Sequence, residues 1–397
     1  RTSLSANWSG FSDSHSGIED YSYSIGTTSG GTDIKSWTSN GTSTSVTVSD
    51  LSLTVGTTYY FSVKATDYAG NVSGVATSNG VKLLGIIYTV KTDGTGGYTT
   101  IQAALDGSTS GDTVLVYEGT YKERVEISGG RYVKSQFNSS SDSTAIKNTI
   151  IQCPGDDRLL IKDSTLRGFS FLGYGIDVSG TSTLKHILIE DNVGHANFRY
   201  NISVGSYSGA DAVIEDTKIL NSTGGGINFT EGKLTGKNIV ISNNSTAWGG
   251  MGFRCIDSSD DNPANVAHLE NIRIAHNKSY SSGVSGGAMN IYGECDVTVL
   301  NGEFYDNLIV DDSNGIYHGG SVYLAGMSIF SPVLKLINVT SVGNRALYVN
   351  ADSDTTIGPG ISLGYPSSTS PYTNEAKLII SNSIIYDNLQ EISAWGG

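Results

Sequence analysis

The sequence predicts an all-β protein in two parts: a β-sandwich, followed by a parallel β-helix, which is a solenoid of short stacked strands. Three observations predict this class. The apolar residues are mainly Val, Ile and Tyr and the polar ones mainly Gly, Ser, Thr and Asn, a mixture that favours strands and turns over helices. Apolar and polar residues alternate with period two near the N-terminus. Further along, a short motif ending in Asn recurs many times.

The formal net charge of −14 limits the possible partners. An acidic surface repels nucleic acid phosphates and anionic membranes, so we expect neither nucleic acid binding nor membrane insertion. The chain has no run of eighteen apolar residues that would form a membrane-spanning helix. A negatively charged surface is compatible with binding of a divalent cation or of a neutral glycan.

The first part of the chain, residues 1–85, reads as the sandwich. Four segments alternate apolar and polar residues and are separated by turn residues: YSYSIG (21–26), STSVTV (43–48), TYYFSVKATD (58–67) and VATSNGVKL (75–83). The stretch TYYFSVKATDYAGNVSG resembles a fibronectin type III domain, and SGIEDYSYSIGT resembles an early strand pair of that family. The resemblance implies that Tyr60 is the core tyrosine, that the first strand of the sandwich is missing, and that the domain is a spacer or weak binder.

The second part, residues 86–397, begins as a capped solenoid. The segment from Tyr88, YTVKTDGTGGYTTIQAALDG, reads as a strand, a glycine-rich turn and an amphipathic helix near residues 99–106, with Thr99 or Thr100 as its N-cap. Two strands follow, in DTVLVYEG and TYKERVEI. A helix across the end of a strand stack covers exposed backbone edges, so we expect it to cap the β-helix.

The repeat consists of a short strand, an Asn, a loop of variable length, a glycine pair and a second short strand. Spacings between the Asn residues range from 23 to 44, and this irregular period with constant strand cores is typical of a parallel β-helix. We expect these Asn residues to stack as a structural ladder, with Asn277 and Asn307 in neighbouring coils. The ladder residues are Asn192, Asn221, Asn244, Asn277, Asn307, Asn344 and Asn388.

These repeats, for instance GGAMNIY and GGSVYL, resemble right-handed parallel β-helix proteins of the pectate lyase superfamily, and among them bacterial surface proteins. NSIIYDNLQEIS resembles late coils of surface-anchored members, which implies that the chain is an excerpt of a longer protein, truncated at the C-terminus. The resemblance implies an extracellular or cell-surface location in a bacterium. It also implies a polysaccharide or cell-surface glycan as partner, beside further domains of the same chain.

The opening DGTGGYTTIQAALDG, with GTYKERVEI, is also similar to the start of pectin methylesterases. The catalytic segments of that family, Gln-Asp-Thr, Asp-Phe-Ile-Phe-Gly and Gly-Arg-Pro-Trp, do not occur. VGHANFR (193–199) partly resembles a polygalacturonase segment, but no paired Asp residues precede it at suitable spacing. The opening therefore indicates the fold and not an esterase.

A polysaccharide lyase would need a cation to neutralise the uronate carboxylate and a base to remove the α-proton. FRCIDSSDDN (253–262) offers the best local cluster: Arg254 is a catalytic candidate, and Asp257, Asp260, Asp261 and Asn262 could hold Ca²⁺. The alternative is a solvated loop. His276 and His318 are further catalytic candidates, although His276 precedes a ladder Asn and is expected to pair structurally with Asp306.

Aromatic residues in the middle coils suggest sugar contact instead. Trp248, Tyr292 and Tyr317 are the candidates, because aromatic rings on a flat β-helix face stack on sugar rings. For Tyr292 and Tyr323, inward-facing core positions are an equal alternative.

The three cysteines, Cys153, Cys255 and Cys295, have no CxxC spacing, so a zinc or redox site is not indicated. We expect them to be buried small hydrophobic residues, with a Cys255–Cys295 disulfide as the alternative. The sequence thus predicts a secreted or cell-surface β-helix protein with a structural or adhesive, glycan-contacting role. The alternative function is a Ca²⁺-dependent polysaccharide lyase or a related enzyme such as a glycoside hydrolase.

Overall fold

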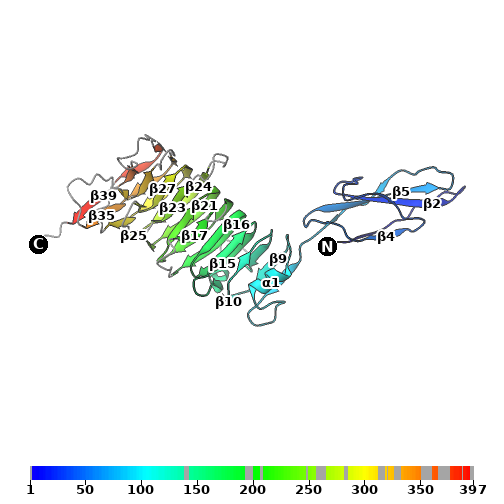
Figure 1. Ribbon diagram of the computed structural model, residues 1–397, viewed down its shortest axis with the longest axis horizontal. Helices are drawn as coiled ribbons and strands as arrows, with labels where there is room; N and C mark the ends of the chain where they lie inside the picture. The colour runs from blue at the N-terminus through cyan, green and yellow to red at the C-terminus, as the bar shows by residue number, and fades with distance from the viewer. Residues whose placement is uncertain are drawn as a thin grey trace. The chain divides into compact units, whose positions relative to one another are not determined.

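A computed structural model shows a chain of two compact units, Arg1–Ile87 with Ser110–Asp112, and Tyr88–Thr109 with Thr113–Gly397 (Figure 1). No helix in the described part of the chain is long and apolar enough to cross a membrane. The residues described are 2–137, 143–192, 200–205, 209–246, 249–255, 265–280, 285–311, 318–319, 321–325, 332–349, 360–364, 376–386 and 388–393.

The first unit consists of antiparallel strands around its own small core. One pair joins β1 (Leu4–Asn7) to β4 (Ser45–Val48). The second sheet has the order β3-β2-β5-β6, and β7 also pairs with β5. Its strands are β2 (Ile18–Gly26), β3 (Lys35–Ser39), β5 (Thr58–Asp67), β6 (Ala76–Thr77) and β7 (Val81–Lys82). The core residues are Tyr21, Tyr23, Ile25, Val48, Leu51, Tyr59, Phe61, Val63 and Ala65.

The core tyrosine of the predicted segment is Tyr59, so the prediction of Tyr60 was wrong by one residue. In β5 the buried face carries Tyr59 and Phe61, because alternate side chains of a strand point to opposite faces. The Tyr59 hydroxyl accepts a hydrogen bond of 2.6 Å from the backbone N–H of Thr54. Tyr60 points the other way and is only partly covered.

The second unit opens with β8 (Ile87–Val90), helix α1 (Ile101–Gly107) and β9 (Thr113–Val116). Thr100 is the N-cap of α1, and its hydroxyl accepts the backbone N–H of Ala103. The Glu123 carboxylate accepts the first two helical N–H groups, at 2.8 and 2.9 Å. These bonds satisfy donors that have no partner within a helix. Ile101, Ala104 and Leu105 are buried on one face, so the helix closes the end of the core.

After this cap the chain winds as a parallel β-helix (Figure 1). Its coils supply strands to two parallel sheets, and from Ser245 onward the described strands also form a third, short sheet. Sheet 1 contains β11 (Glu126–Ile127), β14 (Leu159–Lys162), the start of β16 (Ile176–Glu190), β17 (Tyr200–Val204), β20 (Gly225–Phe229), β23 (Met251–Cys255), β27 (Met289–Gly293), β32 (Val322–Ala325) and β36 (Ile361–Gly364).

Sheet 2 is the broadest and bends along its length. It contains β10 (Gly119–Lys122), β12 (Tyr132–Ser135), β13 (Thr149–Gln152), β15 (Thr165–Leu172), the rest of β16, β18 (Ala210–Glu215), β19 (Lys218–Leu220), β21 (Gly232–Ser242), β24 (Asn265–Ala275), β28 (Cys295–Leu300), β29 (Glu303–Tyr305), β33 (Val333–Ile337), β34 (Thr340–Val342), β37 (Lys377–Ser381) and β38 (Ile384–Tyr386).

Sheet 3 is short and contains β22 (Ser245–Thr246), β25 (Lys278–Tyr280), β30 (Leu308–Asp311), β35 (Arg345–Val349) and β39 (Leu389–Ser393). Two minor elements are the parallel pair β26 (Ser285–Gly286) with β31 (His318–Gly319), and helix α2 (Ser143–Asn148). One continuous core runs through the stack, because equivalent inward residues lie in register from coil to coil. Ile227, Met251, Met289 and Val322 form one such column.

The predicted Asn ladder is present and buried at the turn between sheets 2 and 3. The Asn277 side-chain amide donates to Asn307 Oδ1 at 3.0 Å, and Lys278 pairs with Leu308 in the next coil, which confirms that the two Asn residues lie in neighbouring coils. One rung was predicted wrongly. Asn221 is exposed and is the turn residue with positive φ just before the ladder position. Ser222 occupies the ladder position itself, and its backbone N–H donates to Asn244 Oδ1.

A second ladder, not foreseen from the sequence, lies on the outside of sheet 2. Each bend of the sheet has a residue with positive φ, a conformation that Asn, Asp and His tolerate better than other side chains. The bend residues from β16 onward are His186, Asp216, Asn238, Asn271, Asn301, Asn338 and Asn382, and Gly168 occupies the same position in the coil before. Neighbouring side chains are joined from Asn338 to Asp216, each amide donating to the oxygen before it at 2.8 to 3.2 Å.

All three cysteines are buried, as expected, but two of them form the disulfide that was the alternative to free thiols. Cys255 and Cys295 form a disulfide with an S–S distance of 2.00 Å, and their Cα atoms lie 5.5 Å apart. Cys153 is free and buried, as expected. The disulfide joins the end of β23 to the start of β28, so it links two neighbouring coils.

Candidate functional site

The candidate site lies on the outer face of sheet 1, where β23, β27 and β32 run side by side. In β27, Met289 and Ile291 belong to the core, so Asn290 and Tyr292 face outward. In β32, Val322 and Leu324 are core residues, so Tyr323 faces outward too. Both tyrosines therefore point away from the interior of the β-helix, so the inward-facing alternative is wrong for both, although Tyr323 is covered on the outer face.

The two tyrosines form an aromatic pair. Their ring centroids are 5.7 Å apart with an interplanar angle of 56°, within the range for favourable aromatic contacts. Tyr323 is buried and Tyr292 is half-buried. Burial raises the pKa of Tyr292, so its hydroxyl keeps its proton and can act as a hydrogen-bond donor over the physiological range.

A third tyrosine hydroxyl reaches the same face. Tyr200 is buried, and a Cβ atom built on Gly252 would lie 2.2 Å from its hydroxyl oxygen. Only glycine at position 252 leaves room for that hydroxyl above β23. The sequence offered a weak signal for this contact: Gly252 occupies an outward position between the core residues Met251 and Phe253, where any other side chain would project outward.

Polar groups flank the aromatic pair. Arg254 is exposed on β23 and lies in register with Tyr292 on the neighbouring strand. Asn290 is buried beside Tyr292, and among the described residues neither of its side-chain polar atoms makes a hydrogen bond of ordinary geometry. A buried amide without a protein partner is a usual place for a bound water or ligand group. The face thus combines ring surface, a cation and amide donors and acceptors.

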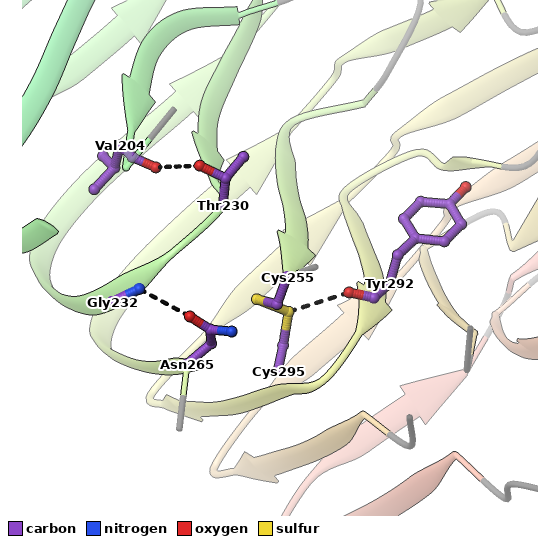
Figure 2. Close-up of a disulfide and its surroundings, with 7 residues drawn as sticks. All are labelled: Val204, Thr230, Gly232, Cys255, Asn265, Tyr292 and Cys295. Atoms are coloured by element: carbon purple, nitrogen blue, oxygen red, sulfur yellow. Dashed lines mark hydrogen bonds between the residues drawn. A yellow bond between two sulfur atoms is a disulfide. The ribbon is translucent and has the colours of Figure 1, made fainter. Parts of the chain in front are cut away.

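The disulfide fixes the strand ends that carry Arg254 and Tyr292 (Figure 2). Cys295 Sγ lies 3.2 Å from the Tyr292 carbonyl oxygen, and the Tyr292 ring projects away from the sulfur atoms. Between them Gly293 has a φ of +75°, and a Cβ there would lie 1.9 Å from the Cys255 carbonyl oxygen. Backbone and disulfide together hold the aromatic residue in place.

The same outer face continues toward the first coils and carries two carboxylates there. Glu126 and Asp177 each pair in register with Leu160, so their Cα atoms are about 10 Å apart, two strand spacings. Both line a hollow of about 240 Å³. Burial raises the pKa of the Asp177 carboxyl group, although Arg158 donates to it at 2.8 Å and opposes the shift. Glu126 is half-exposed and pairs with Arg124.

No protein-family model and no curated protein sequence matches the chain. Among solved structures, it is similar to a family 28 exopolygalacturonase from Yersinia enterocolitica, with 13% identity, 96% of both chains covered and a TM-score of 0.29. It is also similar to pectin methylesterase PemA from Erwinia chrysanthemi, with 10% identity, 75% and 94% coverage and a TM-score of 0.35. The mannuronan C-5 epimerase AlgE4 A-module from Azotobacter vinelandii has 14% identity, 74% and 95% coverage and a TM-score of 0.33.

Such distant likeness does not bear on activity, so any ligand has to be argued from this chain's own residues. Of the predicted sugar-contact residues, Tyr292 lies on the outer face of sheet 1, whereas Trp248 and Tyr317 lie outside the described residues. The predicted calcium ligands Asp257, Asp260, Asp261 and Asn262 also lie outside them, so that site stays a prediction. Within the described ranges, no group of three or more His, Cys, Asp or Glu side chains could hold a metal ion.

The structure does not unite the three catalytic candidates. Arg254 is on sheet 1, whereas His276 is at the turn between sheets 2 and 3. His276 Nδ1 lies 3.6 Å from Asp306 Oδ2, and both side chains are about half exposed, which confirms the expected structural pairing. For His318 the structure describes only the backbone, which pairs with Ser285 in β31 and β26.

Proposed function

We propose that this protein binds a polysaccharide along the outer face of sheet 1, as a structural or adhesive component outside a bacterial cell. The observation that supports it is the half-buried Tyr292 ring, which packs against Tyr323 and lies beside the exposed Arg254 on the outward face of sheet 1. Tyrosine rings offer sugars an apolar surface with a polar edge. The amide of Asn290 and the tyrosine hydroxyls add the few placed polar groups that orient a ligand.

The fold suits a linear polymer, because successive coils repeat the outward positions at about 4.8 Å. The Cys255–Cys295 disulfide supports an extracellular location, since disulfides persist in oxidising compartments. The two antiparallel sheets of the first unit support a fibronectin type III-like β-sandwich with a spacer role, as the sequence resemblance implies.

Affinity electrophoresis in gels that contain single polysaccharides tests this proposal. We expect retardation of the wild type by at least one neutral or acidic polysaccharide, and about tenfold weaker retardation of Tyr292→Ala. Tyr280→Ala is the matched control, because Tyr280 is also an exposed tyrosine beside a cation, Lys278, but lies on sheet 3. Equal loss in both variants, or no retardation by any polysaccharide, would contradict the proposal.

A second candidate function is a polysaccharide-active enzyme, and the Glu126–Asp177 hollow favours it. In glycoside hydrolysis, one protonated carboxyl group donates to the leaving oxygen while a carboxylate takes a proton from the attacking water. Asp177 would be the acid, since burial raises the pKa of its carboxyl group although Arg158 opposes this, and Glu126 would be the base. The two strand spacings between them leave room for a sugar and a water molecule.

The enzyme candidate is tested by incubating the protein with the same polysaccharides and measuring new reducing ends. Glu126→Gln should abolish them, whereas Glu270→Gln, at an exposed glutamate of sheet 2, should not. An ultraviolet-absorbing, unsaturated product that depends on Ca²⁺ would instead indicate a lyase, and calcium titration of an Asp260→Ala, Asp261→Ala variant would then test the predicted loop. If a polysaccharide retards the protein but no product forms, binding is supported and the enzyme candidate is rejected.

A further inference from the structure

A column of three cations crosses the outer face of sheet 2 near its first coils. Lys134 pairs in register with Arg167, and Arg167 pairs in register with Lys185. The residues just before them in sequence, Val133, Leu166 and Leu184, belong to the core, so the three charged side chains point outward from adjacent strands. Neighbouring Cα atoms in this column are therefore about 4.8 Å apart.

The described residues balance the charge of only one of these three cations. Lys185 donates to Glu215 at 2.5 Å and lies 3.7 Å from Asp216. No carboxylate among the described residues pairs with Lys134 or Arg167 in the same way. Within the described ranges, the Arg167 guanidinium makes one side-chain hydrogen bond, of 3.5 Å to the Tyr132 hydroxyl, and its Nε is buried without a hydrogen-bond partner.

Two aromatic rings lie beside these cations. Its guanidinium carbon lies 5.4 Å from the centre of the Phe137 ring, and the Lys134 ammonium lies 6.0 Å from the centre of the Tyr132 ring. Aromatic faces hold a cation in position without neutralising its charge. The two side chains are thus positioned beside each other while their charges still repel.

Other cations on the same face show the contrast. Further along this column Lys237 lies between Glu215 and Glu270, and it forms an ion pair of 3.1 Å with Glu270. Lys335 pairs with Asp296 at 3.2 Å. In a chain with a net charge of −14, uncompensated neighbouring cations are the exception, and they create a local positive field.

We propose that Lys134 and Arg167 form a binding site for an oxyanion, either a free ion such as sulfate or a sulfate or carboxylate group carried by a polysaccharide. The planar guanidinium matches the geometry of such oxygens, the ammonium supplies a second positive charge, and the Tyr132 hydroxyl borders the site. This site is on sheet 2 and independent of the tyrosine pair on sheet 1. A bound anion removes the repulsion between the two cations.

Thermal melting in sodium sulfate and in sodium chloride of equal ionic strength tests the free-ion form. We expect the wild type to melt higher in sulfate, because a ligand that binds only the folded state stabilises it. Arg167→Gln and Lys134→Gln should each lose most of that increment. Lys237→Gln is the matched control and should keep the sulfate increment. This variant also removes one positive charge from the column, but carboxylates already balance the charge of Lys237.

Calorimetric titration with dextran sulfate and with neutral dextran distinguishes the two sources of the anion. The site binds sulfate groups of a polymer if two results are found together. The wild type binds dextran sulfate at least about tenfold more tightly than Arg167→Gln does, and free sulfate has no effect. Circular dichroism verifies that each variant is folded, and Arg167→Lys should restore part of the binding. The proposal is overturned if neither form of sulfate binds, or if Arg167→Gln and Lys237→Gln lose binding equally.

Discussion

The buried Asn ladder shows how single amides hold adjacent coils together. Asn277 Oδ1 accepts both the backbone N–H and the side-chain amide of Asn244, while its own amide donates to Asn307 and to the Ile241 carbonyl. Asn277 is fully buried. Every polar atom of the side chain is thus used, so removal of the amide leaves buried groups in the coils above and below without partners.

We therefore expect Asn277→Ala to lower the free energy of unfolding by about 1 to 3 kcal/mol. Chemical denaturation followed by circular dichroism measures it. Asn271→Gly is the matched control, because Asn271 belongs to the exposed ladder, its freed partners can bond to water, and glycine adopts the positive φ of this bend without strain. Equal loss in the two variants would show that burial of the amide is not what makes the inner ladder stabilising.

At the same scale, His186 couples stability to pH. It occupies a left-handed bend with its ring 4.5 Å from that of Phe137, and burial lowers its pKa from the ordinary value of 6.5. Asp216 opposes the shift, while Arg167 and Lys185 add to it. Because the unfolded chain then binds the proton more readily, stability is full above pH 6.5 and falls as the pH drops from there through the lower folded pKa.

His186→Asn should make the melting temperature less dependent on pH between about 7.5 and 5. Asn suits this position, since it occupies the equivalent bend at Asn238 and Asn271. The measurement is a series of thermal melts of both proteins across that range. The expected direction would be contradicted if the melting temperature of the wild type rose as the pH was lowered through this range.

At the scale of elements, the disulfide lies at the turn between sheets 1 and 2. Cys295 pairs in register with Asn265, the first residue of β24, and Cys255 ends β23. The cross-link therefore holds the end of one strand against the start of another in the next coil. It closes a sequence separation of 40 residues, which restricts the unfolded chain.

Removal of this cross-link in a Cys255→Ser, Cys295→Ser double variant should cost about 2 to 4 kcal/mol of unfolding free energy. Denaturation of the wild type with and without reductant should show a loss of the same size. The double variant itself should not respond to reductant, because the remaining Cys153 is unpaired and buried. Thiol titration should first show that the reductant has produced three free thiols. If the unfolding free energy of the wild type is then unchanged, the disulfide does not contribute to stability.

For the whole molecule, each unit has its own core. The first unit packs around Tyr59 and its neighbours, and the second around the columns that include Phe253. Units with separate cores are able to unfold separately. The β-helix core is also continuous from coil to coil, so the second unit gains its stability from contacts between neighbouring coils.

Differential scanning calorimetry of the chain should therefore resolve two transitions. Tyr59→Ala should move only one of them, with a loss of about 3 to 5 kcal/mol as for other buried aromatic residues, and Phe253→Ala should move only the other. A single transition that shifts with both variants would show that the units unfold together.

Local patterns in the sequence determined much of the fold. Period-two alternation predicted strands, the recurring Asn predicted a stacked turn, and Thr100 before an amphipathic segment predicted the capped helix α1. Each depends on residues a few positions apart. Errors of one residue arose where neighbours were chemically alike, as with Tyr60 for Tyr59 and Asn221 for Ser222, since a shift of one residue exchanges the two faces of a strand.

Tertiary structure alone decided the candidate sites. The outward orientation of Tyr292 and Tyr323, the Tyr200 hydroxyl above Gly252 and the column of Lys134, Arg167 and Lys185 all depend on which residues of different coils come into register. Register between coils is set by the inward apolar positions, because a slip of one residue would turn them outward, and it holds although the loops between coils vary in length. A local sequence pattern specifies where a strand forms. Which residues of the next coil lie beside that strand depends on how the whole β-helix winds, and the candidate binding sites consist of residues from different coils.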